Sequence, residues 1–451
     1  MKTDIERELE DSERRYALRF ASSVAGRPLT NIDVHQKQAR RIFDALSRVE
    51  EIKTMDRDRW GGWDWQYSEA QRRGELYVPW LDISLAQLRA EIQHQYPDAP
   101  LEPLWPNKKR FALCLTHDVD VVMPHPSLRS LVHTVRRHAG SDFNWRMRAW
   151  RAKGLVRDWI HQLRSHTGRH FRNFEEWMKL EDSFGFKSTF FFVPSRLHHR
   201  HAYDCNYQFH DIVYHGDRTM MVSEMMQTLD GAGWEVGLHG SYQSAVENSL
   251  LIDERQQIED ILGHPIVSTR QHWLHYDVQV TPCLQAEAGF RVDSTQGFNR
   301  SIGFRAGTAF PYWCWDHQTG QSLPVLEIPQ HIMDGGLFQA NSLEYCEALA
   351  IRHSVEIMDA VERVGGCLTL SWHPHTVNNE KYWVVYKTLL EEAARRNAWG
   401  CSAGDVYKWW TERERRLLFD DAGSHVVGYR DEGSRVRQGL LGACSAVRDH
   451  D

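Results

Sequence analysis

The sequence predicts an α/β fold built on a parallel sheet. Short, continuously apolar runs recur in the middle of the chain, as in strands buried on both faces, and stretches with helical periodicity separate them. Polar residues follow each apolar run. Strands and helices that alternate in this way form either a parallel α/β barrel or a doubly wound sheet. At roughly 150 residues per domain, the 451 residues leave room for two or three domains.

Residues 1–107 are predicted to form an α-rich N-terminal region, to which the sequence assigns no role. A charged helix is expected over 3–20 and a second helix over 33–55. A tryptophan-rich loop follows at 60–65, and Pro103 and Pro106 lie at the end of the region.

Strands and helices alternate along residues 108–405, and this region is predicted to form the α/β barrel. Parallel strands are buried on both faces by the helices that connect them, which explains the unbroken apolar runs. Strands are expected at 111–116, 187–194, 234–238, 266–269, 324–328 and 367–372, and helices at 223–232, 253–262 and 344–364.

A basic insertion at 121–175 interrupts this rhythm, and residues 406–451 are expected to form a helix and a loosely ordered tail. Between 127 and 172 the chain has 11 Lys or Arg residues, 2 Asp residues and three tryptophans. Basic residues interleaved with tryptophan are typical of peripheral contact with an anionic membrane. A solvated helix pair over the barrel mouth is the alternative.

Composition excludes several function classes. The net charge of -7 argues against a nucleic-acid binder. The eight cysteines form no CxxC pair, which argues against a zinc knuckle or a disulfide framework. The N-terminus lacks the basic-then-apolar pattern of a secretory signal. We therefore expect a cytoplasmic protein.

Two carboxylates follow the first apolar run, in Thr116-His117-Asp118-Val119-Asp120. Catalytic groups gather at the carboxyl ends of strands in parallel barrels, and residues two apart on an extended segment share a face. One aspartate can therefore bind a metal ion while the other accepts a proton. A helix N-cap is the alternative for this pair.

Imidazoles and a guanidinium follow three further runs. His239 ends the third run, Thr269-Arg270-Gln271-His272-Trp273 ends the next, and Trp372-His373-Pro374-His375 ends the last. His239 is a candidate metal ligand, Arg270 can hold a catalytic carboxylate, and His373 is a candidate general acid. Each of these residues also has a purely structural interpretation.

These residues, in this order, resemble the motifs of the polysaccharide deacetylases with a NodB homology domain, which are related to carbohydrate esterase family four. The resemblance covers roughly residues 109–405 and includes the strand at 187–193 and Leu370-Ser371-Trp372-His373. The segment 292–316 is similar to a bacterial subgroup associated with surface-polysaccharide gene clusters. The resemblance implies a distorted (β/α) barrel, of the seven-strand type, with a metal site at one rim.

The family pattern implies a role for each matched residue. Asp118 corresponds to the general base, Asp120 and His239 to metal ligands of a divalent ion, with zinc expected, Arg270 to the residue that orients Asp118, and His373 to the acid. Position 243 normally holds a second histidine ligand, and here it is Gln243, a weaker zinc ligand than imidazole. His272, Trp273 and His375 are expected to face the substrate, and His375 is an alternative source of the missing nitrogen.

The predicted function is therefore metal-dependent removal of acetyl groups from an N-acetylated glycan or glycan precursor, with a carbohydrate as the substrate. Two alternatives remain open at this stage. One is hydrolysis of another non-peptide C–N bond, and the other is a non-catalytic glycan-binding barrel, which Gln243 favours.

Overall fold

A computed structural model describes residues 8–54, 56–98, 101–122, 153, 174–194, 201, 203–205 and 207–418. The two interpretations of the basic stretch at 127–172 and the prediction for the tail beyond residue 418 lie outside the described residues, apart from Lys153. None of the described helices combines the length and hydrophobicity that a membrane-spanning helix needs.

The described residues contain one curled sheet of ten strands, and the predicted α/β fold is confirmed. Its strands run in the order β10-β11-β1-β2-β5-β6-β7-β9-β8, with β12 also paired to β1. All pairs are parallel except β8 with β9. The strands are β1 Ala112–Val119, β2 Thr189–Phe192, β5 Glu235–Gly240, β6 Ser268–Gln271, β7 Val292–Asp293, β8 Tyr312–Asp316, β9 Gln321–Glu327, β10 Ile332–Met333, β11 Cys367–Ser371 and β12 Trp399–Cys401.

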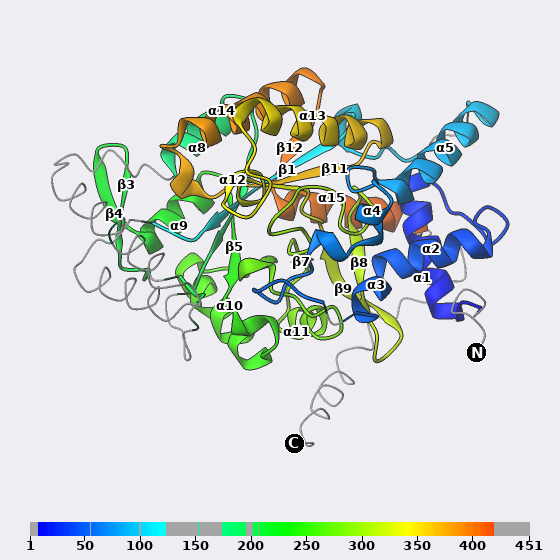
Figure 1. Cartoon of the computed structure of the whole chain (residues 1–451), viewed down its shortest axis with the longest axis horizontal. Coiled ribbons are helices and arrows are strands. Elements are labelled where there is room, and N and C mark those ends of the chain that lie inside the picture. Colours follow the sequence, from blue (N-terminus) through cyan, green and yellow to red (C-terminus); the bar gives the residue numbers. More distant parts are fainter. Residues whose placement is uncertain are drawn as a thin grey trace.

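The apolar runs became strands because helices cover the sheet. Every residue of β1, β2 and β11 is buried. Figure 1 shows α8, α13 and α14 on one side of the sheet and α9, α10 and α11 on the other. The helices are α8 Glu175–Asp182, α9 Val222–Gly231, α10 Asn248–Leu262, α11 Thr281–Glu287, α12 Asp334–Phe338, α13 Glu347–Val364, α14 Glu380–Arg395 and α15 Ala403–Leu418.

The sequence pattern did not predict the shortest strands. β7 and β10 have two residues each and β12 has three, too few for a recognisable apolar run. A small antiparallel hairpin, β3 Ile212–His215 with β4 Arg218–Met221, also lies apart from the main sheet.

The N-terminal helices pack against the barrel and share its hydrophobic core. They gather beside β8 and β9 (Figure 1). The Tyr16 hydroxyl donates to the Trp313 carbonyl over 2.5 Å, and Glu51 pairs with the Arg305 guanidinium over 2.7 Å, both side chains buried. The domain boundary at 107 stays a prediction. The helices are α1 Asp11–Ala25, α2 Gln36–Leu46, α3 Val49–Ile52, α4 Glu69–Arg72 and α5 Trp80–Gln95.

Candidate active site

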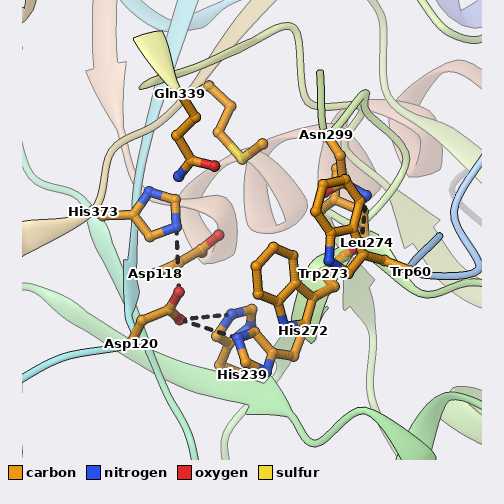
Figure 2. Close-up of a pocket in the computed structure, with 11 residues that line it drawn as sticks. Trp60, Asp118, Asp120, His239, His272, Trp273, Leu274, Asn299, Gln339 and His373 are labelled. Carbon is orange, nitrogen blue, oxygen red and sulfur yellow. Dashed lines mark hydrogen bonds and ion pairs between the residues drawn. The ribbon is translucent and has the colours of Figure 1, made fainter. Parts of the chain in front are cut away.

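The carboxyl ends of five parallel strands meet at a pocket. Parallel pairing aligns these ends, so residues far apart in the sequence converge on one rim. Asp118 comes from β1, His239 from β5, and His373 lies two residues after β11. Figure 2 shows these side chains around the pocket, whose lining residues are Trp60, Asp118, Asp120, His239, His272, Trp273, Leu274, Asn299, Met333, Gln339 and His373.

Asp118 is fixed at the rim by the fully buried guanidinium of Arg270. Arg270 Nη1 lies 2.7 Å from Asp118 Oδ1, and Ser371 Oγ donates to Asp118 Oδ2 over 3.2 Å. Burial alone would raise the pKa of Asp118, but the charges of Arg270, His239 and His373 together outweigh it and lower the pKa. Asp118 is therefore an oriented carboxylate that is ionised at neutral pH.

Arg270 itself has no freedom to leave Asp118. Its Nε donates to the Ser294 carbonyl over 2.7 Å and its Nη2 donates to Ser294 Oγ over 2.9 Å. A further donor, Nη1, reaches Thr116 Oγ1 over 2.8 Å. Because a planar guanidinium with its donors occupied has a fixed position, it also fixes the carboxylate.

Asp120 lies among three imidazoles. Nε2 of His239 is 3.3 Å and Nε2 of His272 is 3.6 Å from Asp120 Oδ1, while Nε2 of His373 is 3.5 Å from Oδ2. The Nδ1 of His239 lies 2.9 Å from the Arg270 carbonyl. A carbonyl only accepts, so this bond places a proton on Nδ1 and makes Nε2 the ring nitrogen that faces Asp120.

His373 is held by a carboxylate that the sequence did not reveal. Asp334, the first residue of α12, lies 2.6 Å from His373 Nδ1, and its other oxygen accepts the His373 backbone N–H over 3.0 Å. Burial alone would lower the pKa of His373, but Asp334, with Asp120 and Asp118, raises it to about 10. His373 is thus a proton donor at neutral pH, with a pKa above the near-neutral value expected from the sequence.

The donor atoms fit a divalent ion. Among the described residues, Asp120, Cys205 and His272 offer ligand atoms that lie within 4.8 Å of one another. A carboxylate, imidazoles and a thiol are ligands that zinc prefers. Nδ1 of His239 is hydrogen-bonded, as in many zinc sites, whereas the buried Nδ1 of His272 has no hydrogen-bond partner among the described residues. The convergence of Nε2 atoms on one carboxylate oxygen matches this chemistry.

The structure places two predicted residues outside the pocket. Gln243 begins the short 3-10 helix η5 Gln243–Ala245, and His375 lies in η7 Pro374–Thr376; neither is among the residues that line the pocket. Next to Gln243, Tyr242 stacks on His275 with ring centroids 4.1 Å apart. Burial, followed by the nearby His373, lowers the pKa of His375 to about 4.

His272 takes the place expected of Gln243. It was predicted to face the substrate, yet its Nε2 points at the same Asp120 oxygen as that of His239. Both Trp273 and His272 line the pocket, and their predicted contact with substrate stays a prediction. The next two residues are backbone outliers: Trp273 has φ 61° and Leu274 has φ 51°, a left-handed conformation unusual for large side chains.

An apolar wall faces the charged groups, and part of it comes from the N-terminal region. Trp60 stacks on Trp273 with ring centroids 4.9 Å apart. Asn299 Nδ2 donates to Asp58 Oδ2 over 3.0 Å and to the Trp273 carbonyl over 2.7 Å, so it joins the two loops. The tryptophan-rich loop was visible in the sequence, but nothing in its pattern indicated this location.

No protein-family model and no curated protein matches the chain. Among solved structures, a protein described as a polysaccharide deacetylase from Mycobacterium smegmatis is 18% identical, with a TM-score of 0.46 over 74% of this chain and 99% of that one. Puue Allantoinase is 16% identical, with a TM-score of 0.43 over 70% of this chain and 95% of that one. A protein described as a polysaccharide deacetylase from Pseudomonas aeruginosa PAO1 is 15% identical, with a TM-score of 0.43 over 70% and 96%. At these values the likeness carries no argument about activity, which has to come from the side chains of the pocket.

Proposed function

We propose that this protein is a metal-dependent hydrolase that removes acetyl groups from an N-acetylated glycan or glycan precursor. One observation carries the proposal. A carboxylate locked by a buried guanidinium, Asp118 with Arg270, opens into the same pocket as Asp120 and three convergent imidazoles. This set offers a base, an acid and a cation site within one small volume.

Amide hydrolysis requires a base that activates water, and Asp118 is suited to that role. Arg270 and Ser371 hold its two oxygens, yet the side chain lines the pocket. A divalent ion held by Asp120, His239 and His272 would lower the pKa of water and polarise the acetyl carbonyl when bound. Asp118 can then accept the proton of the attacking water.

The departing amine requires a proton, and His373 is placed to donate it. Asp334 occupies the Nδ1 position, so the Nε2–H is the one that reaches the pocket. Because its pKa is raised to about 10, His373 carries this proton throughout the neutral pH range.

The opposite wall supports a carbohydrate substrate. Trp273, backed by the stacked ring of Trp60, presents aromatic surface to the pocket, and the apolar faces of sugar rings pack on such surfaces. Side-chain amides of Asn299 and Gln339 also line the pocket and can hydrogen-bond sugar hydroxyls. The alternative of a glycan-binding barrel without catalysis loses its main support, since His272 supplies the imidazole that Gln243 lacks. A cytoplasmic site of action would favour soluble or lipid-linked precursors as substrates.

The test is acetate release by the zinc-loaded full chain from N-acetylated oligosaccharides and sugar nucleotides, with cyclic ureides as the competing class. We expect activity on N-acetyl sugars, abolished by Asp118→Asn while the metal content is unchanged, because the base is lost and the ligands remain. Asp230→Asn, in a surface pair with His264, is the matched control and should behave as wild type. Activity confined to ureides, or metal loss in Asp118→Asn, would contradict these assignments.

A further inference from the structure

Cys205 lies beside Asp120 and His272, two residues that line the pocket, although no strand-end pattern leads to it. Its Sγ lies 3.8 Å from Asp120 Oδ1 and 3.7 Å from His272 Nε2. The side chain is 8% exposed. It is therefore a buried thiol in contact with two of the groups that would hold the ion.

Four donor-atom distances around Asp120 and Cys205 match edges of a tetrahedral zinc site. Zinc bonds of about 2.0 Å to oxygen or nitrogen and about 2.3 Å to sulfur give edges of about 3.3 Å between O and N atoms and about 3.5 Å to the sulfur. The structure has 3.3 and 3.6 Å from Asp120 Oδ1 to the two histidine nitrogens. The distances from Cys205 Sγ to Asp120 Oδ1 and His272 Nε2, 3.8 and 3.7 Å, exceed the expected sulfur edge by only a few tenths of an ångström.

Two hydrogen bonds anchor the Cys205 segment to the loops that carry the imidazole ligands. Asp204 Oδ1 accepts the backbone N–H of Tyr242, directly after the strand of His239, over 2.9 Å. The Tyr203 carbonyl accepts Trp273 Nε1–H, next to His272, over 3.0 Å. The thiol is thus positioned relative to both histidines, as a ligand must be.

We propose that the Cys205 thiolate is a fourth protein ligand of the metal site, together with Asp120, His239 and His272. The inference rests on the metal site of the proposed function and goes beyond it. A thiolate selects a thiophilic ion such as zinc or cobalt over magnesium, calcium or manganese. Catalytic zinc sites reach five ligands in the transition state, so a fourth protein ligand is compatible with hydrolysis.

The probe is Co²⁺ added to the metal-free full chain and followed by absorption spectroscopy. Bound Co²⁺ has visible d–d bands whatever its ligands, whereas a thiolate ligand adds a charge-transfer band in the near ultraviolet. We expect both in the wild type. Cys205→Ser should lose the near-ultraviolet band and keep the visible bands, and Cys346→Ser, at an exposed cysteine, is the matched control that should keep both.

Each outcome decides a separate point. Visible bands without the charge-transfer band, or a charge-transfer band that survives in Cys205→Ser, would overturn the thiolate ligand and leave the proposed function standing. The absence of any Co²⁺ spectrum would overturn both. If Cys205→Ser does not fold, X-ray absorption of the zinc-loaded wild type replaces it: one sulfur at about 2.3 Å supports the inference, and a shell of nitrogen and oxygen alone refutes it.

Discussion

Two buried histidines each pair with a carboxylate, but only one of them, His373, lines the pocket. His117 lies in β1, and His373 follows the neighbouring strand β11. The nitrogens of His117 are both engaged within the protein, Nε2 at 2.7 Å from Glu181 Oε1 and Nδ1 at 2.8 Å from the Trp372 carbonyl. His373 binds Asp334 through Nδ1, and its Nε2 faces the pocket. A histidine–carboxylate pair is therefore a structural element when both ring nitrogens are bonded away from the pocket, and a candidate acid when one of them lies at the pocket beside the proposed metal ligand Asp120.

The surroundings of the two carboxylates show the same difference. Glu181 also accepts hydrogen bonds from Ser188, Trp234 and Tyr386, over 2.7, 2.8 and 2.8 Å, and lies away from the pocket. Burial would raise the pKa of Glu181, but His117 lowers it. Such a cluster ties strand, helix and loop together. Function and stability can thus be separated by experiment at chemically similar pairs.

The largest effect is expected from His373→Asn, which removes the acid. Turnover of N-acetyl sugars should fall by about 10²- to 10⁴-fold, the usual contribution of a general acid. An aryl acetamide, whose leaving group needs less protonation, should lose much less, and the ratio of the two kcat values measures the acid role. An equal loss on both substrates would assign His373 another function.

Glu181→Gln is expected to destabilise the fold without altering chemistry. Breaking a buried pair from one side costs about 3–5 kcal/mol, measurable as the free energy of unfolding in urea. The kcat per folded molecule should stay at the wild-type value. Asp230→Asn, which breaks the exposed pair with His264, is the control and should cost at most about 1 kcal/mol. A lower kcat in folded Glu181→Gln would show that the His117–Glu181 pair also affects catalysis, which would contradict the purely structural role assigned to it.

Another buried histidine, His331, is expected to make the folded protein less stable in acid. Its Nδ1 accepts the Thr369 N–H over 3.1 Å and its Nε2 faces the Thr308 carbonyl, without any carboxylate. Burial lowers its pKa to about 4. The unfolded chain binds this proton near pH 6.5 and the folded chain does not, so stability present above pH 6.5 should fall by about 3 kcal/mol as the pH drops to 4.

Unfolding free energies measured between pH 7 and 4 check this expectation. His331→Gln should lessen the pH dependence while lowering stability at pH 7, and His353→Gln, at a partly exposed surface pair, should leave the slope unchanged. A slope that is the same in His331→Gln and wild type would assign the acid sensitivity to other groups.

The smallest effect is expected from Gln243→His. Residue 243 lies outside the pocket, so zinc affinity, measured by competition with a chelator, should be unchanged. His272→Gln, the matched removal of an imidazole beside Asp120, should weaken zinc binding strongly. A tighter site in Gln243→His would place that side chain at the metal after all.

Local patterns predicted the strands that frame the pocket and the residues that end them. β1, β5, β6 and β11 have apolar runs, so Asp118, His239 and His373 could be found at their ends. Asp334 also follows a strand directly, but that strand, β10, has only two residues and is too short to show an apolar run in the sequence. Cys205 and Trp60 reach the pocket from loops, by contacts over long sequence separations that periodicity does not encode.

The stacking of Trp60 on Trp273 has a practical consequence. A fragment cut at the predicted boundary near residue 107 would lack one wall of its own pocket and would expose the apolar surface that α1, α2 and α5 now cover. Biochemical work on the isolated barrel would therefore underestimate both the solubility and the selectivity of this hydrolase candidate. Expression trials should keep the first hundred residues attached.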